Sequence, residues 1–316
     1  MVSAKKSSIK RILITVISIL LVFCLISIIA TKLIYDSIFS RTHIDPLTVP
    51  NSLSQMVQER EAFEYTCGEN MLQGFLYNCK NNTAKDSLVI LAPGFHAGAD
   101  SYLWQINELN DMGYGVFAFD PTGSFSSGGE STIGFPQEFI DLDATIKYVE
   151  KQHRFGYNRL VLLGHSRGGY AACCALSLDY DISAVISISG VNSAMEAVMN
   201  SSVNYVGNIA YLNYGFLWLY QAMLFGGKTV NMSAEKAINE SDVPVLIIHG
   251  INDSEVPVDR YSIISHKNDI TAKNAEFYAY DHGENSGHTD LLFDKDGTAN
   301  EKLFSYIDSF LVNSVF

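Results

Sequence analysis

Residues 160–170 read Leu160-Val161-Leu162-Leu163-Gly164-His165-Ser166-Arg167-Gly168-Gly169-Tyr170, an apolar run that ends at a serine flanked by glycines. The small residues 171–176 follow and are compatible with a helix. A strand, a sharp turn and a helix in this order lift a serine hydroxyl above a sheet, and Gly164 and Gly168 leave room for the turn. The new helix also presents free N–H groups where negative charge would develop. The stretch predicts that Ser166 is a nucleophile, with an idle serine in a tight turn as the alternative.

Strands and helices alternate on both sides of this stretch. Apolar runs predict strands near 63–67, 71–77, 87–92, 114–119, 184–189, 243–249 and 276–280, and helices near 102–112, from Pro136 onward, around 258–265 and at 301–311. Such alternation is typical of a mainly parallel sheet covered by helices on both faces. The sequence therefore predicts an α/β domain over residues 61–316, with a long insertion at 191–242.

The charge of the chain is unevenly distributed. The net charge is −13, and residues 1–43 carry six Lys and Arg against one Asp, which leaves −18 for residues 44–316. So acidic a body is a poor partner for nucleic acid. Five cysteines without a Cys-x-x-Cys pair argue against a zinc ribbon or a disulfide scaffold. A Cys67–Cys79 bridge is not expected, because Cys79 would lie far from the turn that follows Cys67.

The N-terminal region is long and apolar. Residues 12–30 are nineteen positions without a charge, which as a helix would span about 28 Å, close to the ~30 Å core of a bilayer. Four basic residues precede this run, at positions 5, 6, 10 and 11, and the positive-inside rule places such a flank in the cytoplasm.

The predicted organisation is a cytoplasmic tail at 1–11, a transmembrane anchor at 12–34 and a stalk at 35–60, with the domain outside the cell membrane. A cleaved signal peptide ending at Ala30 is the alternative. Its apolar region should be only about 7–15 residues long, so the uncleaved anchor is favoured.

Two later loops supply partners for Ser166. A serine hydroxyl becomes a strong nucleophile only when a base removes its proton and a carboxylate orients that base. Asp253 follows the predicted strand 243–249, and His288 follows the strand 276–280. We assign Asp253 as the orienting carboxylate and His288 as the base, with His282 as the alternative base.

A tetrahedral intermediate also needs two donors for its oxyanion. The backbone N–H of Arg167, directly after the nucleophile, is the first candidate. The second is the N–H of Phe95, which follows Gly94 in the loop after the strand 87–92.

Residues 61–316 resemble the α/β-hydrolase superfamily, most of all its serine-aminopeptidase and monoglyceride-lipase-like branch. The matching stretches are Leu91–Phe95, Asp120–Gly123, Gly164–Gly169, His249–Asp253 and Gly287-His288. The resemblance implies an eight-stranded sheet, hydrolysis through an acyl-enzyme and no cofactor. Pro93 stands where the family often has His, and Arg167 replaces a commoner Met. Neither change removes a catalytic atom, because both oxyanion donors are backbone groups.

Two other patterns carry less weight. Residues 222–229 match a loose phosphate-loop pattern, but they follow an aromatic, helix-like segment and lack the first glycine. Asp253, His282, His288 and Asp290 contain no pair whose spacing would fix a metal geometry. We therefore expect neither a nucleotide nor a metal.

The insertion 191–242 lies where this superfamily often has a lid over the nucleophile. Its residues 205–225 are rich in aromatic and aliphatic side chains, with Tyr214 and Trp218 on one helical face and Met223 on another. Flexible Met and flat aromatic rings suit an apolar acyl chain, so these three residues are predicted to bind substrate. The expected substrate is a small ester with an apolar acyl chain. A short peptide or aminoacyl amide is the alternative, and a non-catalytic binding protein is the least expected.

Overall fold

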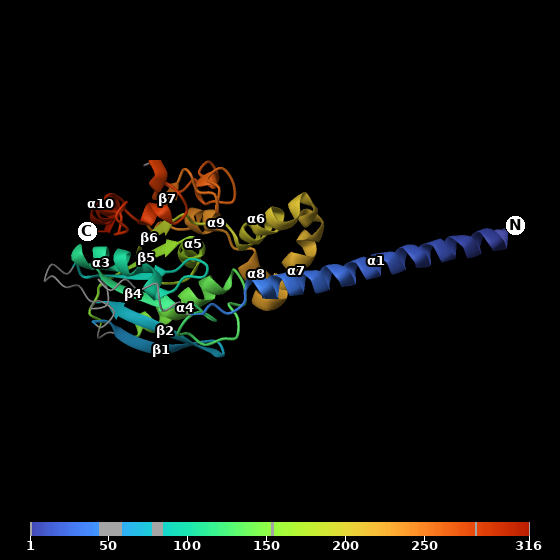
Figure 1. Cartoon of the computed structure of the whole chain (residues 1–316), viewed down its shortest axis with the longest axis horizontal. Coiled ribbons are helices and arrows are strands. Elements are labelled where there is room, and N and C mark those ends of the chain that lie inside the picture. The colour runs from blue at the N-terminus through green and yellow to red at the C-terminus, as the bar shows by residue number, and fades with distance from the viewer. Residues whose placement is uncertain (1, 44–58, 78–84, 153–154, 282, 316) are drawn as a thin grey trace.

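The computed structural model describes residues 2–43, 59–77, 85–152, 155–281 and 283–315. A long N-terminal helix, α1 (Val2–Ile38), extends away from an α/β domain, and the helices of the insertion lie beside its C-terminal end (Figure 1).

The centre of the domain is one eight-stranded sheet. In chain order the strands are β1 (Glu61–Cys67), β2 (Asn70–Tyr77), β3 (Ser87–Ala92), β4 (Gly115–Asp120), β5 (Arg159–His165), β6 (Ile182–Ile188), β7 (Val245–Gly250) and β8 (Ala275–Tyr280). They are ordered β1-β2-β4-β3-β5-β6-β7-β8. The β1–β2 and β2–β4 pairs are antiparallel, and all other pairs are parallel. This confirms the mainly parallel eight-stranded sheet.

Helices cover both faces of the sheet, as predicted. The helices α4 (Gln137–Glu150), α5 (Arg167–Cys174) and α9 (Ala234–Asn239) pack on one face, while α3 (Leu103–Asp111) and α10 (Glu301–Val315) pack on the other. Successive side chains of a strand point to opposite faces. In β5, Leu162 joins the first core while Val161 and Leu163 join the second. A strand buried on both faces is apolar at every position, which is why the run before Ser166 shows no alternation.

The insertion is helical, also as predicted. It contains α6 (Ala194–Val206), a 3-10 segment (Gly207–Asn213), α7 (Tyr214–Phe225) and α8 (Gly227–Val230). The hydroxyl of Ser193 caps α6 by accepting the N–H of Glu196, and Gly207 ends it with φ of 69°. Helix α7 packs along α1, where the rings of Phe23 and Phe216 lie 6.1 Å apart.

The segment that follows α1 is fixed to the domain. The Thr42 N–H donates to Gly123 O at 2.9 Å, and the Phe125 N–H donates to Thr42 O at 3.0 Å. The Arg41 guanidinium binds the carbonyl oxygens of Phe125 and Ser127, each at 3.0 Å. The predicted stalk at 35–60 therefore differs from the structure at its start, because residues 35–38 belong to α1 and 39–43 lie on the domain. Residues 44–58 of this stalk are outside the described residues.

The helix predicted around 258–265 is wrong. This segment forms turns and a short 3-10 helix, Ile264–His266. Two of its backbone groups pair with the loop after β6, since the Asn192 N–H donates to Tyr261 O at 2.8 Å and the Ile263 N–H to Gly190 O at 2.9 Å, and its local bonds are short turns such as Ser265 N–H to Ser262 O at 3.2 Å. Tertiary hydrogen bonds have replaced the helical ones.

The remaining 3-10 turns lie at Ala99–Tyr102, Ala175–Ser177, Gly283–Asn285 and Asp290–Leu292. Cys67 is a free thiol beside Asp141, and Cys79 lies outside the described residues.

Candidate active site

Ser166 sits on a strained turn between β5 and α5, with φ 56° and ψ −115°. Such a conformation in a residue other than glycine costs of order 1–3 kcal/mol and is found mainly at functional sites. Side chains are excluded from both flanking positions. A Cβ at Gly164 would collide with the backbone of Gly168, and a Cβ at Gly168 would collide with the carbonyl of Ala92. The two glycines are therefore required for the turn that exposes Ser166.

The structure brings Ser166, His288 and Asp253 together. His288 Nε2 lies 2.8 Å from Ser166 Oγ, and His288 Nδ1 lies 2.7 Å from Asp253 Oδ2. Asp253 follows β7, and His288 lies between β8 and the 3-10 turn Asp290–Leu292. The alternative base, His282, is outside the described residues. Three loops at the carboxyl ends of parallel strands thus form one continuous hydrogen-bonded chain.

Asp253 is held in its ionised form. Burial alone would raise the pKa of this carboxyl, but hydrogen bonds from His249, His288 and the Val256 N–H outweigh burial and lower its pKa well below the usual range. Asp253 Oδ1 accepts the N–H groups of Glu255 at 2.9 Å and Val256 at 2.8 Å. The other oxygen, Oδ2, faces His288 and can stabilise a positive charge there.

Buried polar side chains that the sequence analysis did not identify support His288. The Tyr102 hydroxyl accepts the Gly94 N–H and lies 2.9 Å from His165 Nδ1. His165 Nε2 lies 3.0 Å from the carbonyl oxygen of His288. Burial and the nearby His288 lower the pKa of His165 to about 3, so its ring is neutral. It therefore accepts from Tyr102 through Nδ1 and donates to the His288 carbonyl through Nε2.

His249, at the end of β7, supports the carboxylate. Its Nε2 lies 2.8 Å from Val256 O and 3.1 Å from Asp253 Oδ2. His165 and His249 both lie in stretches that match the superfamily, and this match was the signal in the sequence that could have identified them as parts of the site. Tyr102 carries no such signal in the sequence.

The candidate oxyanion donors lie on either side of Ser166. Arg167 is the first residue of α5, where backbone N–H groups lack partners within the helix. Phe95 lines two cavities together with Ser166, and a Cβ at the preceding Gly94 would lie 3.4 Å from Ser166 Cβ. Both predicted backbone positions are therefore next to the serine.

The side chain of Arg167 is buried and interacts with the loop before α4. Its Nε donates to Phe135 O at 3.0 Å, and a terminal nitrogen donates to Gly134 O at 2.6 Å. Glu138 Oε2 lies 3.8 Å from Arg167 Nε, and burial raises the pKa of Glu138 to about 8 although Arg167 opposes the shift. The arginine thus holds the loop that carries Phe135 beside Ser166.

Ser166 lies between two cavities. The first has a volume of about 140 Å³ and is lined mainly by apolar residues, among them Ile38, Phe39, Phe135, Val191 and Val198. The second has a volume of about 230 Å³ and lies toward α3, with Gly94, His96, Ser101, Tyr102 and Leu292 among its lining residues. Phe95, Ser166, Glu255 and His288 line both. The two cavities therefore meet at Ser166, and a substrate bound there has access to both.

The structure does not place Tyr214, Trp218 and Met223, which were predicted to bind substrate, at the two cavities beside Ser166. None of the three lines either cavity beside Ser166. The side chains of Tyr214 and Met223 are exposed, and Trp218 Nε1 donates to Asn231 at 2.9 Å. The reason is that α6, and not α7, forms the inner wall of the insertion, while α7 packs along α1.

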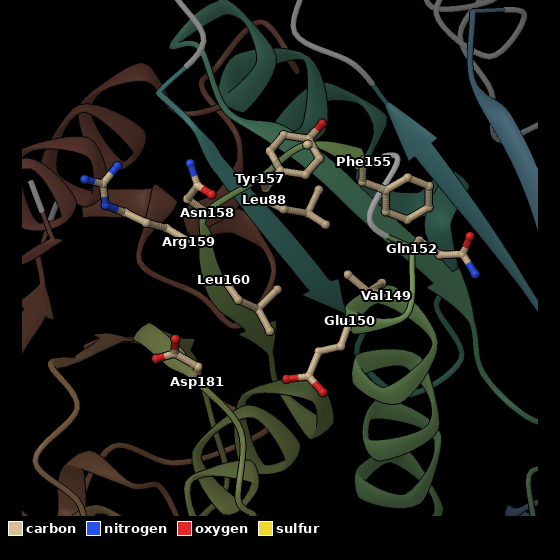
Figure 2. Close-up of a pocket in the computed structure, with 11 residues that line it drawn as sticks. Leu88, Val149, Glu150, Gln152, Phe155, Tyr157, Asn158, Arg159, Leu160 and Asp181 are labelled. Carbon is tan, nitrogen blue, oxygen red and sulfur yellow. The ribbon is translucent and has the colours of Figure 1, made fainter.

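A larger cavity, about 560 Å³, lies at the opposite end of the parallel strands (Figure 2). Leu88 and Arg159 at the beginnings of β3 and β5 line it, together with Glu150 and Asp181. Burial and the nearby Asp181 raise the pKa of Glu150. This cavity lies away from the Ser166 loop and carries no serine, cysteine or histidine among its described lining residues.

In the described part of the chain, no three His, Cys, Asp or Glu side chains are grouped so as to hold a metal ion.

A comparison with known protein families matches one segment of the chain. Residues 83–210 match the family described as serine aminopeptidase, S33; this segment contains Ser166 but neither Asp253 nor His288. No curated protein matches the chain.

Several solved structures have a similar fold. An esterase of Pyrococcus furiosus has a TM-score of 0.65 at 21% identity and covers 88% of this chain and 100% of its own. The α/β hydrolase GrgF of a Penicillium species has a TM-score of 0.57 at 16% identity and covers 81% of this chain and 99% of its own. The Pyrococcus horikoshii acylaminoacyl peptidase has a TM-score of 0.57 at 16% identity and covers 84% of this chain and 44% of its own. The chain therefore has the α/β-hydrolase fold, and the family match over residues 83–210 supports a serine hydrolase.

Proposed function

We propose that this protein is a membrane-anchored serine esterase that cleaves carboxylic esters with an apolar acyl chain. The observation that carries the proposal is the hydrogen-bonded chain from Ser166 through His288 to Asp253, which opens on an apolar cavity. Catalytic roles for these three residues follow from the chemistry that such a chain supports.

In the first half-reaction, Ser166 Oγ attacks the ester carbonyl carbon while His288 Nε2 takes the hydroxyl proton. The carbonyl oxygen becomes an oxyanion, which the N–H groups of Phe95 and Arg167 stabilise. When the C–O bond to the alcohol breaks, His288 returns the proton to the departing oxygen. The acyl group is then esterified to Ser166.

Water completes the cycle by the same route. His288 removes a proton from water as its oxygen attacks the acyl carbon, and the proton then returns to Ser166 Oγ as the acid leaves. Asp253 remains ionised throughout, keeps the Nδ1–H tautomer of His288 and stabilises the imidazolium that forms.

The two cavities suit the two halves of an ester. The apolar cavity on the side of α6 would hold the acyl chain, and the cavity toward α3, with its polar lining side chains, would hold the alcohol. Each buried methylene contributes about 0.8 kcal/mol, so a few methylenes raise kcat/KM about tenfold or more if they are bound in the transition state.

Aminoacyl amide cleavage is the second candidate function, because Glu255 lines both cavities and its carboxylate could bind a substrate amine.

We expect kcat/KM to rise from acetyl through butyryl to octanoyl esters and to be lower for aminoacyl amides than for any of these esters. Glu255→Gln should leave this order intact. Faster aminoacyl cleavage that Glu255→Gln abolishes would instead identify a peptidase.

Helix α1 supports the proposed anchor. Residues Lys10–Ile38 are long and apolar enough to cross a membrane, and few of their side chains are buried. We propose a single-pass protein of the cell membrane with a cytoplasmic N-terminus and the catalytic domain outside.

External protease added to intact cells should therefore digest the domain, and protein recovered from membranes should begin before Ile12. A cytoplasmic protein digested in parallel should stay intact and so serve as the control. A mature N-terminus at Thr31 would contradict the anchor and indicate a cleaved signal peptide.

A further inference from the structure

One face of the C-terminal half of α1 is buried, although most of the side chains described between Lys10 and Ile38 are exposed. Ser27, Thr31 and Tyr35 recur every fourth residue and are 7%, 4% and 2% exposed, and Phe39, directly after α1, is 3% exposed. Residues at this spacing share one helical face. A helix that served only as a tether would need no such face.

The same part of α1 is bonded to the insertion by specific polar contacts. Asn213 Nδ2 donates to Thr31 Oγ1 at 2.6 Å, and the Tyr220 hydroxyl donates to Asp36 Oδ1 at 3.0 Å. The rings of Tyr35 and Tyr220 meet edge to face, 5.2 Å apart. Directional contacts of this kind fix both the rotation of α1 and its position along α7.

The end of α1 reaches the nucleophile. Ile38 and Phe39 line the apolar cavity together with Ser166. The ring of Phe39 packs edge to face on Phe95 at 5.4 Å, and the Phe39 carbonyl accepts the Thr132 N–H at 2.9 Å. The N-terminal helix and the candidate oxyanion loop therefore pack directly on each other.

A separate apolar cavity, about 80 Å³, lies between α1 and the insertion, apart from the two cavities that Ser166 lines. It shares Ile38 and Val198 with the cavity at Ser166, and it extends along α1 to Ile34 and Thr31. Its polar lining side chains are already bonded, since Thr31 pairs with Asn213 and the Ser202 hydroxyl donates to Val198 O at 2.7 Å. The surface offered to a ligand is thus apolar.

Taking the proposed esterase function as given, we propose that the end of α1 completes the acyl-binding site and that Ile38 and Val198 form the junction through which longer chains pass. The occupant is the unbranched acyl chain of an amphiphilic ester, with its carboxyl carbon at Ser166 and its tail directed toward Thr31 and Ile34. Because these two residues end the predicted span 12–34, the tail points to the membrane side of the domain.

The test is Ile38→Trp in the full-length protein, measured with soluble acetyl and octanoyl esters. A larger side chain at the junction should exclude the distal methylenes, each of which contributes about fourfold to binding. We expect the octanoyl-to-acetyl ratio of kcat/KM to fall at least tenfold. The matched control is Leu33→Trp on the exposed side of α1, which should leave the ratio unchanged.

Labelling of Ser166 by a small fluorophosphonate reports whether each variant has folded. If Ile38→Trp is not labelled, Val198→Leu narrows the same junction from the α6 side and should lower the ratio about fourfold. An unchanged ratio in a labelled junction variant, or an equal fall in Leu33→Trp, would overturn this inference while leaving the esterase intact. Absence of ester turnover in the wild type would overturn the proposed function as well.

Discussion

Ser166→Ala is expected to lower kcat/KM for octanoyl ester hydrolysis by roughly 10⁴–10⁶-fold. The change deletes only the oxygen that attacks the carbonyl carbon, 2.8 Å from His288 Nε2. The fold should persist, because the strained turn depends on Gly164 and Gly168, and among the described residues the Ser166 hydroxyl bonds only to His288. Steady-state hydrolysis, with the thermal unfolding midpoint measured in parallel, tests both statements.

The control for this variant is Ser177→Ala. The Ser177 hydroxyl donates to Cys174 O at 2.7 Å on the 3-10 turn that follows α5, so its loss should leave turnover within about twofold. Near-wild-type activity of Ser166→Ala would exclude Ser166 as the nucleophile.

Asp253→Asn should produce the second-largest effect, a fall of about 10⁴-fold in kcat. An asparagine amide donor facing His288 Nδ1 would favour the tautomer that carries its proton on Nε2, and that nitrogen could no longer accept from Ser166. The amide would also remove the negative charge that stabilises the imidazolium.

Stopped-flow or steady-state ester hydrolysis measures this effect. Asp281→Asn, on the exposed loop after β8, is the matched control and should have little effect. A loss of less than tenfold in Asp253→Asn would show that another group orients His288.

The elements that position the nucleophile were predictable because local sequence determines them. The glycines around Ser166 report a backbone conformation, and the continuous apolar runs report strands buried on both faces. The order of Ser166, Asp253 and His288 along the chain follows from the order of the strands. Each of these signals lies within a few residues of the feature it predicts.

The walls of the site were not predictable because they depend on tertiary contacts. The aromatic composition of α7 pointed to Tyr214 and Trp218, yet α1 covers one side of α7 and α6 faces Ser166. Nothing in the local sequence of Ile38 and Phe39 indicates that they would line a cavity with Ser166, more than a hundred positions away. Tyr102 similarly gains its role only through its contacts with Gly94 and His165.

The role of the Arg167 side chain also depends on tertiary contacts and could not be predicted from the sequence. The sequence identifies it as a departure from the commoner Met but leaves its side chain without a role. In the structure the guanidinium binds the carbonyls of Gly134 and Phe135, and Phe135 lines the apolar cavity.

The central claim, that Ser166 is the nucleophile of a serine hydrolase, is tested most directly by identifying the residue that a fluorophosphonate modifies. Full-length protein would be labelled in detergent, digested with trypsin and analysed by mass spectrometry. The account predicts one adduct, on Ser166, that is absent from Ser166→Ala and strongly reduced in His288→Ala. No adduct on the folded wild type, or an adduct on a different serine, would contradict it.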